Sequence, residues 1–305
     1  MKLANHGVDV FHCQYAGPPF SVTPYIVTLH DIIHETYPEF YPKLLRFFMR
    51  LFYPFSARRA VKVLTGSEYT KSQINRLFKI PAERIEVTPY GASEEFRIID
   101  DSAAIKRIAA SYGVHGRYIL FVGRIEPRKN IQGLLKAYEI VKGKYNIDQK
   151  LVIVGMKDSS FEDFYQDLRA KKVRHDVIFT GGVSQEDLPY IYNGADLFVY
   201  PSFAEGFGLP VLEAMACGTT VITSNSTALP ELVGDAGIMV DAKNTEELAE
   251  AIYKVLKDSN LRNRLKNKGL EQSKLFSWHK TAEKVLDIYR EVCKSDKSWS
   301  LKKAF

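Results

Sequence analysis

The chain has 305 residues, of which 46% are hydrophobic and 26% charged, so its composition is that of a globular protein and excludes a disordered one. Because domains of about 100 to 200 residues are typical, this length predicts two of them. The formal net charge is +6, but the basic residues are spread along the chain without a recognition motif, which disfavours a nucleic-acid partner.

The spacing of the cysteines and the shortness of the apolar runs indicate the cellular compartment of the protein. Cys13, Cys217 and Cys293 are odd in number and far apart, which argues against a disulfide framework and for a reducing environment. The first seven residues lack the apolar core of a signal peptide, and no uncharged run is long enough to span a bilayer. We therefore expect a cytoplasmic protein.

Apolar β-branched runs alternate with amphipathic stretches along the chain, which predicts parallel sheets covered by helices. One group of strands is expected near residues 8–12, 25–29, 62–66 and 85–89. A second group is expected near 118–122, 151–155, 177–180, 197–200, 219–223 and 237–240. Residues 100–112 form a polar connecting helix, so the domains are predicted at 1–97 and 98–276, followed by a helix at 277–296.

The first domain is short of strands. A doubly wound unit normally has about five or six strands, a number that the second group reaches and the first does not. The predicted fold class is therefore α/β with two Rossmann-like domains, the N-terminal one incomplete. From this shortage we expect one of three explanations: the chain is truncated, its start is assigned too far downstream, or it works with a partner.

A candidate reactive residue follows the strand at 25–29. His30 and Asp31 stand at its carboxyl end, the edge at which parallel sheets bind ligands. On these residues alone, a loop histidine with a satisfied hydrogen bond is the commoner interpretation. A zinc site is a rival interpretation, because His30 and His34 are four residues apart around an acid. The zinc-protease motif, in which two histidines stand four residues apart, requires a helix and a glutamate base. Asp31 instead follows a strand, so zinc is disfavoured.

Residues 43–53 form an amphipathic segment with two interpretations. Its cations, Lys43, Arg46 and Arg50, recur at helical spacing on one face, and its apolar residues, Leu44, Leu45, Phe48, Leu51 and Phe52, occupy another. The segment is either a helix packed on its own sheet with a solvated charged side, or a surface helix that contacts anionic lipid at the inner face of the membrane.

Cations follow the buried strand at 118–122. Gly123 and Arg124 open the loop after this strand, Lys129 closes it, and an apolar-periodic helix begins near Ile131. The cations therefore stand where strand passes into helix, at the ligand-binding edge of an open parallel sheet. A diphosphate requires such cations.

The stretch 205–218 predicts an anion-binding helix start between two carboxylates. Gly206 and Gly208 leave the backbone N–H groups open to a ligand, and Pro210 suits the first turn of the helix that follows. A helix N-terminus attracts phosphate. Glu205 and Glu213 are acceptors suited to paired sugar hydroxyls. The two glycines alone would favour an ordinary loop with solvated carboxylates. The separate strand, glycine turn and cations at 118–130 reverse that preference and favour a sugar-nucleotide site.

A dinucleotide site is a weaker interpretation of the same glycines. Val211 stands where that fingerprint requires its third glycine, and the segment lies far from any first strand of a dinucleotide-binding half. We therefore disfavour an oxidoreductase.

Taken together, these motifs resemble those of the group 1 glycosyltransferases of family 4, which have the two-domain GT-B fold. The resemblance rests on the two glutamates, Glu205 and Glu213, on the 123–130 segment, and on Gly181, Gly182 and Val183 before a helix at 188–195. It covers most of residues 85–296. Residues 1–97 resemble only the later part of the family's first domain, whose glycine-containing loop has no match here.

The resemblance implies a role for each matched residue. Arg124 and Lys129 bind the donor diphosphate, Glu213 holds the ribose, and Glu205 acts on the donor sugar. His30 lies near the reacting sugar carbon and is, with Glu205, the expected catalytic residue. The remaining expected donor-binding residues are backbone positions by the phosphates, sugar and base: Gly123, Gly182, Val183, Gly206, Phe207, Gly208 and Leu209.

The resemblance also implies a reaction, namely hexose transfer with retention from a nucleoside diphosphate sugar to a glycan or lipid-linked acceptor. GDP-mannose is the favoured donor, because residues 30–42 and 67–74 look like those of bacterial polysaccharide mannosyltransferases, and a UDP-hexose is the close second. The sequence has no Asp-x-Asp pair, so we expect no metal and no cofactor besides the donor. The alternative, motivated by the missing glycine loop, is a donor-binding or partner subunit with little activity alone.

Overall fold

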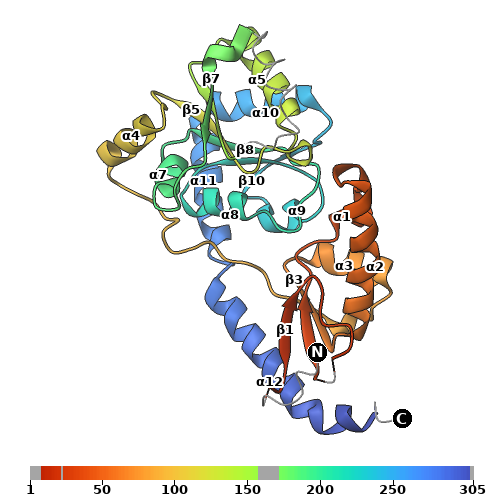
Figure 1. The fold of residues 1–305 in the computed structure, drawn as a ribbon. Helices are drawn as coiled ribbons and strands as arrows, with labels where there is room; N and C mark the ends of the chain where they lie inside the picture. The colour runs from red at the N-terminus through yellow and green to blue at the C-terminus, as the bar shows by residue number, and fades with distance from the viewer. Residues whose placement is uncertain (1–7, 22, 157–171, 303–305) are drawn as a thin grey trace. The chain divides into compact units, whose positions relative to one another are not determined.

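The computed structural model describes residues 8–21, 23–156 and 172–302. The chain forms two compact units, unit 1 from Met1–Gly91 and Ser277–Phe305, and unit 2 from Ala92–Phe276. The chain thus leaves unit 1 after Gly91, whereas the sequence placed the boundary near Arg97. Each unit contains one parallel sheet with helices beside it (Figure 1). The α/β fold class predicted from the sequence is confirmed.

The described part of unit 1 has a four-stranded parallel sheet in the order β1-β2-β3-β4. Its strands are β1 (Phe11–Gln14), β2 (Tyr25–Thr28), β3 (Lys62–Thr65) and β4 (Ile85–Val87). All lie at predicted positions, although β1 begins three residues later than expected. Strands that are consecutive in the chain are neighbours in the sheet, so each new strand is added on the same side of the one before it.

Helices cover both faces of this sheet. Its helices are α1 (Ile33–Thr36), α2 (Lys43–Arg59), α3 (Glu68–Phe78) and α12 (Trp278–Lys302). Because side chains alternate along a strand, Tyr25, Val27 and Leu29 pack in one core with Ala57 of α2 and Ile74 of α3. The opposite face places Ile26 and Leu64 against Ile288 and Val292 of α12. The last helix thus completes the core of the unit that contains the first residues.

Helix α12 is longer than the sequence indicated. The main-chain N–H of His279 donates to Ser277 Oγ at 3.2 Å, so Ser277 caps the start of the helix as expected. The helix then continues to Lys302 instead of ending near 293–296.

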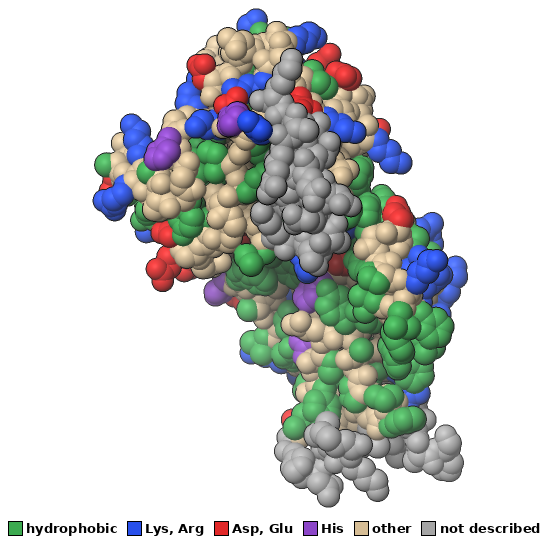
Figure 2. All heavy atoms as spheres, turned by 45° about the horizontal axis from the view of Figure 1, so that its top comes forward, with side chains coloured by type: hydrophobic (Ala, Val, Ile, Leu, Met, Phe, Trp, Pro, Cys, Tyr) green, Lys and Arg blue, Asp and Glu red, His purple; other side chains and the backbone are tan. Residues whose placement is uncertain are grey.

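The apolar residues in the first three turns of α2 do not pack on the sheet. The inward side of the helix is formed by half-buried Met49 and Tyr53 and by buried Ser56 and Ala57. Leu44 is 70% exposed, Phe47 62% and Leu51 55%. We call the exposed set the α2 apolar surface, which Figure 2 shows as part of the green area over unit 1: Leu44, Leu45, Phe47, Phe48, Leu51, Phe52 and Phe55. The helix therefore packs on its own sheet, as one interpretation of the sequence predicted, but it does so through Tyr53 and Ala57 and not through the apolar face that the sequence indicated.

The described part of unit 2 has a six-stranded parallel sheet in the order β10-β9-β8-β5-β6-β7. Its strands are β5 (Tyr118–Val122), β6 (Lys150–Val154), β7 (Val177–Gly181), β8 (Leu197–Tyr200), β9 (Val221–Ser224) and β10 (Gly237–Val240). The chain adds β6 and β7 on one side of β5 and then returns to add β8, β9 and β10 on the other. The strand order therefore reverses between β5 and β8, the point at which doubly wound sheets bind ligands.

The described helices of unit 2 include α4 (Ser102–Ser111), α5 (Ile131–Tyr145), α7 (Leu188–Asn193), α8 (Leu209–Ala216), α9 (Leu229–Val233), α10 (Thr245–Lys257) and α11 (Ser259–Ser273). Of these, α4, α5, α7 and α8 begin within two residues of the starts predicted from the sequence. The tight contact of the Tyr145 and Tyr253 rings, 3.5 Å between centroids, joins α5 to α10. Within the described parts of either unit, no helix is long and apolar enough to cross a membrane.

Candidate functional site

The candidate site of unit 2 lies where the sheet order reverses. Strands β5 and β8 are neighbours in the sheet, so the loops that follow them, residues 123–130 and 201–208, leave the sheet side by side. The main-chain N–H of Phe203 donates to Arg128 O at 2.9 Å and joins the two loops directly. The Asn130 amide adds a second link at 3.2 Å to Pro201 O and also binds Ala242 O at 2.7 Å.

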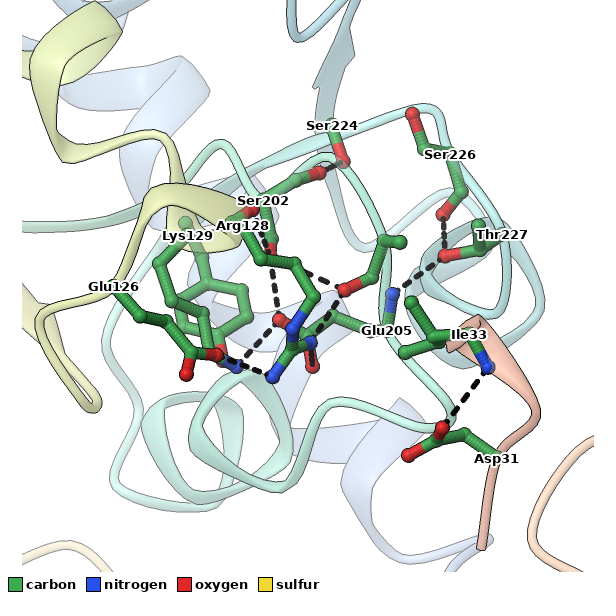
Figure 3. Close-up of polar contacts among 12 residues, drawn as sticks. Asp31, Ile33, Glu126, Arg128, Lys129, Ser202, Glu205, Ser224, Ser226 and Thr227 are labelled. Carbon is green, nitrogen blue, oxygen red and sulfur yellow. Dashed lines mark hydrogen bonds and ion pairs between the residues drawn. The ribbon is translucent and has the colours of Figure 1, made fainter. Parts of the chain in front are cut away.

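A charged cluster holds these loops together (Figure 3). Lys129 Nζ lies 2.6 Å from Glu205 Oε1, and Arg128 Nη1 lies 3.1 Å from Glu205 Oε2. The second guanidinium nitrogen of Arg128 reaches Glu126 Oε1 at 2.6 Å. Ser202 Oγ donates to Glu205 Oε1 at 2.5 Å. Glu205 thus has both oxygens occupied by groups of its own chain.

Burial and charge act in opposite directions on this cluster. Burial alone raises the pKa of Glu205, but the charges of Lys129 and Arg128 outweigh it and hold that pKa at about 2. Burial lowers the pKa of Lys129, and the Glu205 charge opposes this. Lys129 Nζ also donates to Tyr200 OH at 2.6 Å. The cluster is a hydrogen-bonded ion pair inside the protein, and Glu205 is an anion at neutral pH.

The loop before α8 contains one glycine in a backbone conformation that other residues rarely adopt. Gly208 has a φ of +112°, a conformation that favours glycine, and it directly precedes the first helical residue, Leu209. Gly206 is half-buried and Phe207 is buried. The main-chain N–H of Glu205 donates to Thr227 Oγ1 at 2.8 Å, which fixes the start of the loop.

Glu213 differs from Glu205 in forming no ion pair among the described residues. It lies one turn into α8 and accepts a hydrogen bond of 2.9 Å from Tyr192 OH. Burial raises the pKa of Glu213, and the Tyr192 hydrogen bond opposes the rise. Tyr192 belongs to α7, so this bond joins two helices at the sheet edge.

The remaining predicted donor residues lie on the same carboxyl edge of the sheet. Gly123 follows β5 and has a φ of +153°, and Arg124 beside it is exposed. Gly182 and Val183 follow β7, two strands away from β5. The sheet therefore brings the two glycine-bordered loops and both predicted cations to one edge, with Gly182 and Val183 further along it.

Sequence reasoning missed several members of the cluster. Arg128 forms an ion pair with Glu205 as Lys129 does. Its place beside Lys129, in a loop with two predicted donor-binding cations, could have indicated it. Tyr200 and Ser202 gave no such signal, because a tyrosine at a strand end and a serine in a loop are common in any core.

His30 lies at the carboxyl edge of the other sheet, that of unit 1. It follows β2, and its Nδ1 is 2.5 Å from Tyr90 OH, while the Tyr15 ring meets it edge-on at 5.3 Å. Burial lowers the pKa of His30, and Asp31 opposes this. His34 stands in α1, which begins at Ile33, so the two histidines do not share a helix as a zinc-protease motif requires. In the described ranges, no group of three or more His, Cys, Asp or Glu gathers to hold a metal ion.

A family model matches most of each of the two units. The model of the glycosyl transferases group 1 matches residues 108–272, and the model of the glycosyltransferase family 4 matches residues 1–96.

Two relatives from Escherichia coli show different degrees of coverage. The O-antigen chain mannosyltransferase B is 36% identical over 281 residues, which are 90% of this chain and 74% of that protein. A serotype-specific mannosyltransferase WbdA is 32% identical over 280 residues, which are 89% of this chain and only 34% of that protein. The chain thus spans about three quarters of the first relative and a third of the second.

Solved structures share the fold at lower identity. The sucrose-phosphate synthase of Thermosynechococcus elongatus superposes with a TM-score of 0.79 at 24% identity, over 96% of this chain and 75% of that one. The Anabaena protein Alr3699/HepE, solved in complex with UDP and glucose, gives 0.76 at 20% identity, over 88% of this chain and 72% of that one. With both units matched, the chain belongs to the group 1 glycosyltransferases of family 4, and its two parallel α/β units correspond to the GT-B fold.

Proposed function

We propose that this glycosyltransferase moves a hexose from a nucleoside diphosphate to a glycan or lipid-linked acceptor, with GDP-mannose as the favoured donor. The observation that supports it best is the cluster of Lys129, Arg128 and Glu205 at the reversal point of the sheet. The choice of mannose is supported by the relatives, two of which are named mannosyltransferases. A UDP-hexose is the second choice, supported by the complex of the Anabaena protein with UDP and glucose.

The diphosphate is assigned to the cations and to the start of α8. The positive dipole end of α8 attracts phosphate oxygens, and Arg124 and Lys129 add full charges at the same edge. Together they stabilise the negative charge that develops on the leaving diphosphate, so the reaction as proposed requires no metal. Glu213 binds the ribose hydroxyls, and Gly182 and Val183 lie by the base.

Glu205 is assigned to the donor sugar as an anion. A carboxyl whose pKa is about 2 has no proton to give at neutral pH, so Glu205 does not act as a general acid. Its negative charge instead stabilises the positive charge that develops on the sugar ring as the bond to the diphosphate breaks. Retention follows if the departing diphosphate assists the incoming hydroxyl on the same face. His30 is assigned to the reacting carbon.

Calorimetric titration of the full chain with GDP, UDP and ADP tests the donor site. One nucleotide is expected to bind at about micromolar strength, which corresponds to about −8 kcal/mol. Arg124→Ala and Glu213→Ala should each weaken that binding about tenfold or more. Arg117→Ala is the matched control, because Arg117 is an exposed arginine at the amino end of β5 that pairs with Asp196. Absence of binding by all three nucleotides contradicts the proposal.

A second candidate function is a donor-binding or partner subunit with little activity alone. It is favoured by the sheet of unit 1, which has four strands in its described part against six in unit 2. Release of GDP from GDP-mannose by the chain alone, with a polysaccharide acceptor present, contradicts it. Saturable GDP binding without turnover, with activity restored by a second protein, supports it.

The α2 apolar surface supports a peripheral membrane contact, which would bring the enzyme to a lipid-linked acceptor at the inner face of the membrane. Large apolar and aromatic side chains exposed beside Lys43 and Arg50 are the composition of a helix that lies in an anionic bilayer surface. Vesicles with and without phosphatidylglycerol test it by co-sedimentation. Phe47→Ser with Leu51→Ser should abolish binding to the anionic vesicles, whereas Leu77→Ser, an exposed leucine on α3, should not. Concentration-dependent dimerisation lost in the same variant, without vesicle binding, would instead show that a second copy covers this surface.

A further inference from the structure

The ring of His30 has a partner that the sequence did not reveal. Tyr90 follows β4, and its hydroxyl lies 2.5 Å from His30 Nδ1. His30 follows β2, so the contact crosses from one strand end to another along the carboxyl edge of the unit 1 sheet. Among the described residues, no hydrogen bond to the other ring nitrogen, Nε2, is found.

Tyr90 is itself held on two sides. Its ring stacks on Trp278 of α12, with centroids 5.6 Å apart and planes 25° from parallel. Gly66 packs so closely against the ring that a Cβ there would come within 2.8 Å of Tyr90 Cε2. The hydroxyl is therefore delivered to His30 by a side chain with little freedom to move, as expected of a residue that orients another.

We propose that Tyr90 is a positioning residue that donates its hydroxyl proton to His30 Nδ1, so that His30 presents an Nε2–H donor to the substrate. This inference rests on the proposed role of His30 at the reacting sugar.

Acid and base strength decide which partner donates. A phenol is a stronger acid than the N–H of a neutral imidazole, and an imidazole nitrogen is a better base than a phenol oxygen. The stronger hydrogen bond therefore has the phenol as donor, which leaves the imidazole proton on Nε2. Burial, together with Tyr15 and Asp31, raises the pKa of Tyr90, so the phenol keeps its proton at every working pH. Burial lowers the pKa of His30, which favours the neutral ring.

Unit 1 contains a matched control. His12 Nδ1 lies 2.5 Å from Tyr289 OH, and its Nε2 is 2.7 Å from Thr28 Oγ1. Tyr289→Phe therefore removes a hydrogen bond of the same kind and length from the same unit, without touching His30. Both tyrosine-to-phenylalanine changes keep the aromatic ring, so that Tyr90→Phe retains the stack on Trp278.

The first measurement is the tautomer of His30 by two-bond ¹H–¹⁵N correlation in the ¹⁵N-labelled full chain at pH 8, with the His30 signal assigned from its loss in His30→Gln. We expect the wild type to carry the proton on Nε2 and Tyr90→Phe to show a mixture of tautomers. A wild-type His30 with its proton on Nδ1 overturns the inference, and this result needs no variant of Tyr90 to fold and no enzyme activity.

The second measurement is release of GDP from GDP-mannose, in which kcat is expected to fall about tenfold in Tyr90→Phe with KM unchanged, as the loss of one positioning hydrogen bond implies. Tyr289→Phe should match the wild type. Unchanged kcat in a folded Tyr90→Phe, with His30→Gln inactive, overturns the positioning role alone. Full activity in His30→Gln instead refutes the proposed role of His30 and, with it, this inference about its partner.

Discussion

Lys129→Met tests the buried ion pair at the centre of the candidate site. The change removes the cation 2.6 Å from Glu205 and leaves a buried carboxylate with Arg128 as its remaining charged partner. The pKa of Glu205 is lowered from 4.5 to about 2, and a shift of that size corresponds to about 3 kcal/mol. This is the net effect of Lys129, Arg128 and Ser202 after the opposing effect of burial. Removing one partner of a buried pair also leaves the other uncompensated, which typically costs about 3 to 5 kcal/mol. We expect Lys129→Met to lower the free energy of unfolding of unit 2 by about 3 kcal/mol.

The assay is urea unfolding at pH 7, followed by far-ultraviolet circular dichroism. Tryptophan fluorescence reports on the wrong unit, because both tryptophans of the chain belong to unit 1. Glu205→Gln and the double variant complete a cycle, and the double variant should be more stable than Lys129→Met alone, since it no longer buries an unpaired charge. A loss below about 1 kcal/mol in Lys129→Met, with no recovery in the double variant, would refute the reasoning.

Three further predictions concern the same unit. The depressed pKa of Glu205 contributes stability that is complete above pH 4.5 and is lost as the pH falls toward about 2, so acid unfolding monitored by circular dichroism should be less steep in Glu205→Gln. The ionised carboxylate of Glu213 has the opposite effect on stability. Burial raises its pKa, so the ionised form destabilises the fold at pH 7. Glu213→Gln should therefore raise the melting temperature while weakening nucleotide binding in calorimetry; a lower melting temperature would contradict the assigned cause. Gly208→Ala should cost about 1 to 3 kcal/mol in urea unfolding, because its φ is +112° and the new Cβ would lie 2.7 Å from Leu229 Cδ2. Gly143→Ala, in a helix with nothing near the new Cβ, is its control and should not destabilise.

The strands could be predicted because the sheets are parallel and buried on both faces. Strands such as 118–122 and 197–200 are continuous apolar runs, and each lies where the sequence placed it. The turns after β5 and before α8 could also be predicted. Their backbone has a positive φ at Gly123 and Gly208, and a positive φ usually requires a glycine, which the sequence shows directly.

The contacts within the site were less readable. An ion pair between residues 129 and 205 depends on which strands become neighbours, and nothing in either segment records that β5 pairs with β8. The same limit hid Tyr90, which meets His30 from a strand end 60 residues away.

The α2 helix shows why periodicity alone misplaces a face. Its apolar residues have the spacing of a packed stripe, but the inward side of the helix is formed by Met49, Tyr53, Ser56 and Ala57. Small residues allow a close approach of helix to sheet, and a hydrophobic pattern does not distinguish that side from one that meets lipid or another protein.

The carboxylate of Glu205 gives the proposed donor site a resident counterion. A pyrophosphate that reaches Lys129 does not meet a bare cation, because Glu205 pairs with Lys129 and shares Arg128 with Glu126. On the proposed assignment, the substrate would enter by exchange of anions, and loosening of the internal ion pairs would offset part of its attraction to the cation. When the spent nucleotide departs, Glu205 would pair fully with Lys129 again. The site would thus give up some affinity for the nucleotide and gain, at the end of each cycle, an anion ready to displace the product.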